Sequence, residues 1–72
     1  LARIVSWALA QLDEKHRLVV ELREIDGMEH RDIAETLGIP EGTVWSRLSI
    51  GRRKLREVLR ARLSEDTLPG AV

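Results

Sequence analysis

Apolar residues recur every three or four positions along almost the whole chain, and no segment alternates apolar and polar residues as a strand would. This spacing gives each of several helices one apolar stripe, and it predicts an all-α fold. The stripes indicate helices at about 2–11, about 14–26, 30–37 and 40–63. Since the chain has 72 residues and only 3% aromatics, a core of Leu, Ile, Val and Ala is expected.

Residues with special backbone behaviour mark the helix ends. Asp13 is expected to cap the second helix through its carboxylate, and Gly27 to end that helix in the left-handed conformation. Gly38 supplies the turn after the third helix, and Pro40 opens the fourth helix, where no helical amide bond is required. The second helix is expected to bury one face made of Leu18, Val19, Leu22 and Ile25.

The fourth helix is the longest. Its apolar seam advances in steps of three and four through Val44, Leu48, Gly51, Leu55, Val58 and Arg62. We therefore expect one domain over residues 1–63, followed by a flexible tail over 64–72, where Pro69 and Gly70 interrupt the pattern. The chain begins at Leu1 rather than at Met, which suggests a piece of a longer protein.

Charge is unevenly distributed, although 12 basic and 12 acidic residues cancel. Residues 13–41 hold nine acids and four bases, a net charge of −5, and residues 43–62 hold seven bases and one acid, a net charge of +6. This polarity suggests two charged faces with different partners. Solvated helix faces that keep the domain soluble are the alternative.

The sequence argues against an enzyme, a metalloprotein and a membrane protein. It has no Cys, and it has no Gly-rich phosphate loop after a strand. His16 and His30 lack partners at metal-ligand spacing and are expected to be solvated, whereas Trp7 is expected to be a packing residue. No apolar run approaches the roughly 20 residues that span a bilayer. We expect no cofactor, no metal and no catalytic residue, and a chain compatible with a reducing cytoplasm.

The third and fourth helices form a helix-turn-helix pattern. Ala34 is small where the two helices approach, and Gly38 permits a tight turn between them. Ile39 and Val44 fill the angle, and Leu48 holds the second helix of the pair on the core. Such pairs also occur as plain structural corners, so this pattern alone is only moderately specific.

Four sequence blocks in register extend the pattern: LREIDGM at 22–28, DIAETLGIP at 32–40, GTVWSRL at 42–48 and GRRKLR at 51–56. With these blocks the chain resembles region 4 of bacterial sigma factors of the extracytoplasmic-function (ECF) class, over about residues 8–59. The resemblance implies a four-helix domain that recognises the minus-thirty-five promoter element with its long C-terminal helix. It also implies docking onto the β-subunit flap of core RNA polymerase, an anti-sigma factor as a partner, and a monomer.

The candidate DNA-binding residues lie mainly off the seam of the fourth helix. Those expected to face the major groove are Glu41, Thr43, Trp45, Ser46, Ser49 and Ile50. The phosphate candidates are Arg47, Arg52 and Arg53. Arg23 matches a family arginine that reaches DNA from the second helix, and Arg31 lies near the start of the third. For Arg47, a surface ion pair with Glu35 or Glu41 is the alternative.

The chain departs from the family pattern at several positions. Trp45 stands where Lys or Arg is common, Ser49 and Ile50 replace residues that are more often aromatic, His or Arg, and Glu29 replaces a Ser or Thr cap. Trp45 and Ile50 either read thymine methyl groups or form an apolar patch for a protein partner. The alternative function is therefore a decoy module that binds an anti-sigma factor. The acidic, apolar stretch at 13–41 suits docking of either the polymerase flap or an anti-sigma helix.

Overall fold

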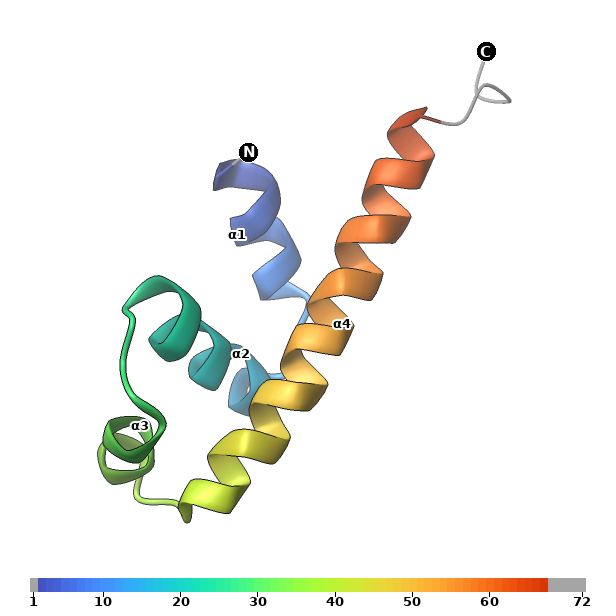
Figure 1. Cartoon of the computed structure of the whole chain (residues 1–72). Helices are drawn as coiled ribbons and strands as arrows, with labels where there is room; N and C mark the ends of the chain where they lie inside the picture. Colours follow the sequence, from blue (N-terminus) through green and yellow to red (C-terminus); the bar gives the residue numbers. More distant parts are fainter. Residues whose placement is uncertain (1, 68–72) are drawn as a thin grey trace.

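The computed structural model describes the backbone of residues 2–67 and the side chains of residues 3–64. It contains α1 (Ala2–Ala10), α2 (Glu14–Val20), η1 (Glu21–Ile25), α3 (His30–Leu37) and α4 (Glu41–Thr67). No strand occurs in this part of the chain, so the all-α prediction is confirmed. Figure 1 shows α4 running the length of the molecule, with α1, α2 and α3 along one side of it.

The helix ends agree closely with the sequence prediction, except at the ends of the second helix and of α4. At the C-terminal end of the chain the difference lies in α4. That helix continues to Thr67 instead of ending near Leu63. Residues 68–72 of the expected tail lie outside the described residues. None of the described helices combines the length and apolar character needed to cross a membrane.

The two loops before α3 and α4 each depend on a glycine. Gly27 and Gly38 have φ values of +71° and +67°, a region that side chains with a Cβ rarely adopt. At the end of α3, the Ile39 amide donates to the Ala34 carbonyl at 3.0 Å and the Gly38 amide donates to the Glu35 carbonyl at 3.3 Å. This pair of bonds is a Schellman motif, which ends α3 and turns the chain toward α4.

The second helix ends differently from the prediction, because its last turn widens into the π-helical turn η1. The Asp26 amide donates to the Glu21 carbonyl five residues back, at 3.1 Å. A wider turn rotates the following residues relative to a regular helix. The predicted burial of Ile25 is therefore wrong, and its side chain is 62% exposed.

The predicted carboxylate cap of Asp13 is also wrong. Helix α2 does begin at Glu14, and the Asp13 carbonyl accepts from the His16 and Arg17 amides. However, the Asp13 side chain makes no cap hydrogen bond, and its Oδ2 lies 4.0 Å from His16 Nδ1. Glu29, at the start of α3, likewise makes no side-chain cap bond.

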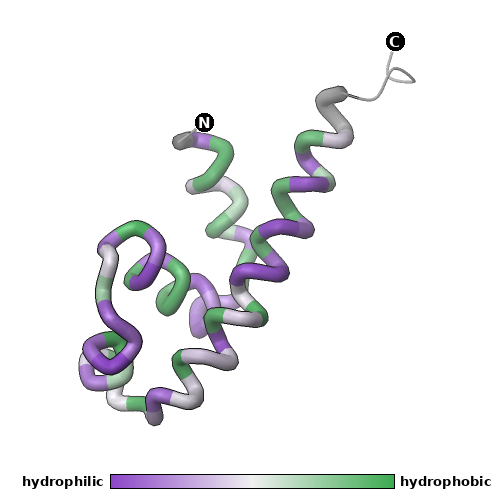
Figure 2. Tube along the Cα trace, in the orientation of Figure 1, coloured by the Kyte–Doolittle hydropathy of each residue, from purple (hydrophilic) through white to green (hydrophobic). Residues whose placement is uncertain are grey.

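The core lies where α4 crosses the three shorter helices. It is entirely aliphatic, and its buried members are Leu9, Leu12, Val19, Val20, Ile33, Ala34, Val44 and Leu48. Leu22, Leu37, Ile39 and Leu55 are partly buried around it. Figure 2 shows hydrophilic and hydrophobic residues alternating along the part of α4 beyond this crossing.

Gly51 sets the distance between α2 and α4. A Cβ at this position would lie 2.7 Å from Val20 Cγ2 and 3.2 Å from the His16 carbonyl oxygen. These separations are too short for an ordinary contact, so only glycine allows the helices to pack this closely. Gly51 thus belongs to the seam that α4 turns toward the core, as its spacing predicts.

Candidate nucleic-acid interface

The helix-turn-helix consists of α3 and α4, joined by Gly38, Ile39 and Pro40. Helix α4 begins directly after Pro40, whose carbonyl accepts from the Thr43 and Val44 amides at 3.0 and 3.3 Å. Ile33, Val44 and Leu48 are fully buried between the helices. The first turns of α4 lie beside α3 at one end of the molecule (Figure 1). This packing holds the exposed side of the first turns in a fixed position.

The structure brings the groove-facing candidates together on the first three turns of α4. Those exposed to solvent are Glu41, Trp45, Ser46, Ser49 and Ile50. Thr43 is half-buried, and its carbonyl accepts a hydrogen bond from Ser46 Oγ at 3.1 Å. The Ser46 oxygen retains acceptor capacity, since a hydroxyl carries two lone pairs. These turns therefore present a surface of mixed acidic, hydroxyl and apolar groups.

Trp45 packs face to face on His30. The two ring centroids lie 3.9 Å apart, and the ring planes differ by 5°. The other parts of the indole remain accessible, and Trp45 is 54% exposed. The rings line an open hollow of about 490 Å³ together with Glu29, Arg31 and Glu41.

The prediction of solvated histidines is wrong at both positions. His30 is half-buried under the indole, and its Nε2 is buried without a hydrogen-bond partner among the described residues. The His16 side chain is only 14% exposed, because it lies on α2 where Gly51 of α4 approaches. Both contacts join residues of different helices, so the spacing along one helix did not reveal them.

Two of the cationic candidates are bonded within the domain. Arg52 binds Glu24 of η1 through its Nε and Nη2, and the Nε–Oε1 distance is 2.6 Å. Arg23 Nη1 donates to the Met28 carbonyl at 2.8 Å, across the loop that precedes α3. These bonds fix η1 to α4 and close the loop at Gly27. Each guanidinium has further N–H donors beyond those used here.

The other three cationic candidates have no such bond. Arg31 and Arg53 are exposed and Arg47 is half-buried, and within residues 3–64 none of them forms an ion pair. The alternative for Arg47, a pair with Glu35 or Glu41, is therefore not found. Arg53 follows Ser46 and Ser49 by seven and four positions, so the three share the side of α4 that faces away from the core.

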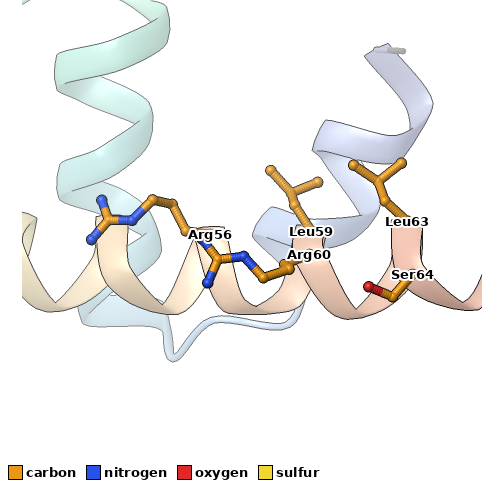
Figure 3. A pocket seen from close by; sticks show the side chains of 5 residues that line it. All are labelled: Arg56, Leu59, Arg60, Leu63 and Ser64. Carbon is orange, nitrogen blue, oxygen red and sulfur yellow. The ribbon is translucent and has the colours of Figure 1, made fainter.

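A second surface lies toward the C-terminal half of α4. One open hollow of about 510 Å³ is lined by Arg3, Ile4 and Trp7 of α1 and by Arg62 of α4. Trp7 is 45% exposed there, so only part of its indole serves packing. Another hollow of about 380 Å³ lies along α4 itself, where Leu59 and Leu63 project from the same side of the helix (Figure 3). This surface combines apolar groups with arginines.

The described side chains offer no metal site. No group of three or more His, Cys, Asp or Glu side chains gathers closely enough among residues 3–64 to hold an ion. The sequence-predicted candidates are instead donors, acceptors and apolar groups, most of them on α4, with Arg23 on η1 and Arg31 on α3.

Comparison with known proteins shows a family match that covers most of the chain, including the helix-turn-helix. Residues 3–55 match the family described as Sigma-70, region 4. The ECF RNA polymerase sigma factor SigW of Bacillus subtilis is 38% identical over 60 residues, which cover 83% of this chain and 32% of SigW. The ECF RNA polymerase sigma factor SigE of Mycolicibacterium smegmatis is 41% identical over 58 residues, which cover 81% of this chain and 23% of SigE.

A third relative is the ECF RNA polymerase sigma factor SigL of Mycobacterium tuberculosis. It is 45% identical over 56 residues, which cover 78% of this chain and 32% of SigL. The chain thus spans only about a quarter to a third of the length of the curated relatives it matches.

Proposed function

The chain belongs to the sigma-70 region 4 family, and on that premise we propose that it binds the minus-thirty-five element of a promoter as part of a sigma factor. In this role it directs RNA polymerase to the start of transcription in the cytoplasm, and it catalyses no reaction itself. The observation that supports the proposal best is the outer side of the first turns of α4. These turns are held by a buried helix-turn-helix core and present exposed side chains of several kinds.

The exposed side chains suit the chemistry of base edges in the major groove. Glu41 can accept a hydrogen bond from the cytosine amino group, and Ser46 and Ser49 can bond either donors or acceptors. Trp45 and Ile50 are 54% and 40% exposed, and they suit the apolar methyl group of thymine. Thr43 lies at the edge of the same surface. We assign sequence readout to these residues.

The arginines suit the phosphate backbone. Arg31, Arg47 and Arg53 have no ion pair among the described side chains, so they can bind phosphate without breaking an internal bond. Arg52 and Arg23 must do so through the donors that their partners leave unused. Of the first three, Arg53 and Arg31 are exposed and Arg47 is half-buried. We therefore expect Arg53 and Arg31 to contribute most to the salt-dependent affinity for DNA.

The proposed protein partner is core RNA polymerase, with its β-subunit flap as the docking element. The names of the relatives support a polymerase partner. The surface along α1 and the C-terminal half of α4 supports a docking site remote from the first turns of α4, since Trp7 and Leu63 are 45% and 49% exposed. The acidic stretch at 13–41 is the other candidate docking surface, for either the flap or an anti-sigma factor.

The second candidate function is a decoy that binds an anti-sigma factor instead of DNA. Two observations favour it: Arg52 and Arg23 are bonded internally, and Trp45 and Ile50 expose apolar surface on α4. A decoy needs no affinity for duplex DNA. Direct binding therefore separates the two functions.

The experiment is a titration of a labelled, randomised duplex pool with the full chain. Binding is measured by fluorescence anisotropy at several salt concentrations. We expect a dissociation constant of about 10⁻⁴ to 10⁻⁶ M, as for non-specific DNA binding by a small module. Arg53→Ala should lower the affinity for all duplexes and reduce the salt slope by about 1. Arg60→Ala is the matched control, because it removes the same charge from the C-terminal half of α4. Equal effects of both variants, or no binding at low salt, would contradict the proposal.

A further inference from the structure

The His30–Trp45 stack joins the two helices of the helix-turn-helix at their N-terminal ends. His30 is the first residue of α3, and Trp45 lies in the second turn of α4. With ring centroids 3.9 Å apart and planes within 5° of parallel, the two rings are in direct contact over their faces. This separation is shorter than the 4.5 to 7 Å that is usual for aromatic pairs.

The fold does not depend on this stack. Ile33, Val44 and Leu48 are fully buried between α3, α4 and the rest of the core, and the Schellman motif fixes the turn. The stack lies outside this core, where Trp45 is more than half exposed. Its removal should leave the helices in place and release only the indole.

The stack restricts what an exposed tryptophan can do. On an open helix surface an indole samples several rotamers. Each rotamer places the indole differently relative to a base edge in the groove. A face-to-face ring contact favours one rotamer by roughly 2- to 10-fold over the alternatives. In that rotamer one indole face is covered by His30, and the remaining surface is available to a ligand.

The imidazole is an unusual choice for a purely structural ring. Its Nε2 is buried and has no hydrogen-bond partner within residues 3–64, and a buried polar atom without a partner is generally destabilising. A phenyl ring would give the same stacking surface without a buried polar atom. His30→Phe is therefore the conservative variant that keeps the stack.

We propose that His30 is a positioning residue for sequence readout. Its ring holds the Trp45 indole in the orientation that contacts the bases, although His30 itself binds no base. This inference rests on the proposed promoter-binding function, and it names a residue on α3 that tunes the specificity of α4. The sequence preference of the chain then depends on the pair, whereas its general affinity for DNA depends on the arginines.

The test uses the Trp7→Phe chain, so that Trp45 is the only tryptophan, and combines it with His30→Ala, His30→Phe or Trp45→Ala. The first readout, without DNA, is quenching of Trp45 fluorescence by acrylamide. We expect His30→Ala to increase quenching and His30→Phe to restore the original value. Circular dichroism confirms that each variant is helical.

The second readout is discrimination, measured as the ratio of the dissociation constants for a random duplex pool and for a preferred duplex selected from it. We expect Trp45→Ala to remove most of the preference at the positions it contacts. His30→Ala should lower the ratio by roughly 2- to 10-fold with little change in affinity for the pool, and His30→Phe should restore it.

The outcomes separate the two claims. If the chain selects no preferred duplex, the proposed function fails, and this inference fails with it. If the chain discriminates equally well after His30→Ala, or if His30→Phe is as impaired as His30→Ala, only the positioning role is refuted.

Discussion

Replacement of Gly51 by alanine tests the close crossing of α2 and α4. The new methyl group would lie 2.7 Å from Val20 Cγ2 and 3.2 Å from the His16 carbonyl oxygen. Val20 is only 1% exposed and β-branched, so it has few alternative rotamers and no open space to enter. The His16 oxygen belongs to the backbone of α2. The methyl group can therefore be accommodated only if the two helices move apart.

The expected loss of stability follows from two opposing terms. Overpacking of a dense core costs about 1 to 3 kcal/mol, whereas alanine is favoured over glycine inside a helix by about 1 kcal/mol. We expect Gly51→Ala to lower the free energy of unfolding by about 1 kcal/mol. For a domain of this size, that corresponds to a Tm lower by about 4 to 8 °C.

The assay is thermal unfolding monitored by circular dichroism, with Gly42→Ala as the matched control. Gly42 lies in the first turn of the same helix, and a Cβ there would meet nothing within 4 Å. Gly42→Ala should therefore leave the Tm unchanged or raise it. If Gly51→Ala melts at or above the temperature of the unsubstituted chain, the close approach described here is wrong.

A double variant attributes the effect to Val20. Val20→Ala alone should destabilise the domain, because it leaves a cavity in the core. Combined with Gly51→Ala, it also makes room for the new methyl group. We expect the double variant to lose at least about 0.5 kcal/mol less than the sum of the single losses. Strictly additive losses would place the strain elsewhere.

Three further substitutions test the loop and the ion pair. Gly38→Ala should lower the free energy of unfolding by about 1 to 2 kcal/mol. The cause is its φ of +67° alone, since nothing lies within 4 Å of the new methyl group. A chemical denaturation curve that coincides with that of the unsubstituted chain would contradict this. In a double-mutant cycle, Glu24→Ala and Arg52→Ala should show a coupling energy of about 0.2 to 1 kcal/mol, because the ion pair is partly exposed to solvent. This coupling energy should fall in about 1 M salt, which screens the charges. Zero coupling at low salt would mean that the bond between η1 and α4 does not form in solution.

Much of the fold could be predicted from periodicity. The three- and four-residue spacing located the four α-helices of residues 2–67, and the seam through Val44, Leu48 and Gly51 is the side of α4 that the structure buries. Gly27 and Gly38 were correctly expected at the turns, because their conformation is local and depends on the residue type. The carboxylate cap expected at Asp13 is equally local but does not form, so a local rule sufficed for these glycines and not for that cap.

The errors at Ile25 and at the two histidines arose where a regular helix was assumed or where two helices meet. Ile25 is exposed because η1 is wider than an α-helix. A helical wheel assumes a constant number of residues per turn, so it cannot predict where a helix widens. Contacts between helices depend on their crossing angles, which one-dimensional spacing does not specify. The exposed side of α4 was thus predictable from its seam, whereas the Glu24–Arg52 bond and the His30–Trp45 stack were not.

The central claim is that the chain binds duplex DNA through the first turns of α4. Its most direct test is amide chemical-shift mapping of the isotope-labelled chain during addition of a preferred duplex. We predict saturable, salt-sensitive shifts that concentrate in residues 41–53 of α4 and at the start of α3. Shifts confined to α1 and the C-terminal half of α4, or no shifts at low salt, would contradict the claim.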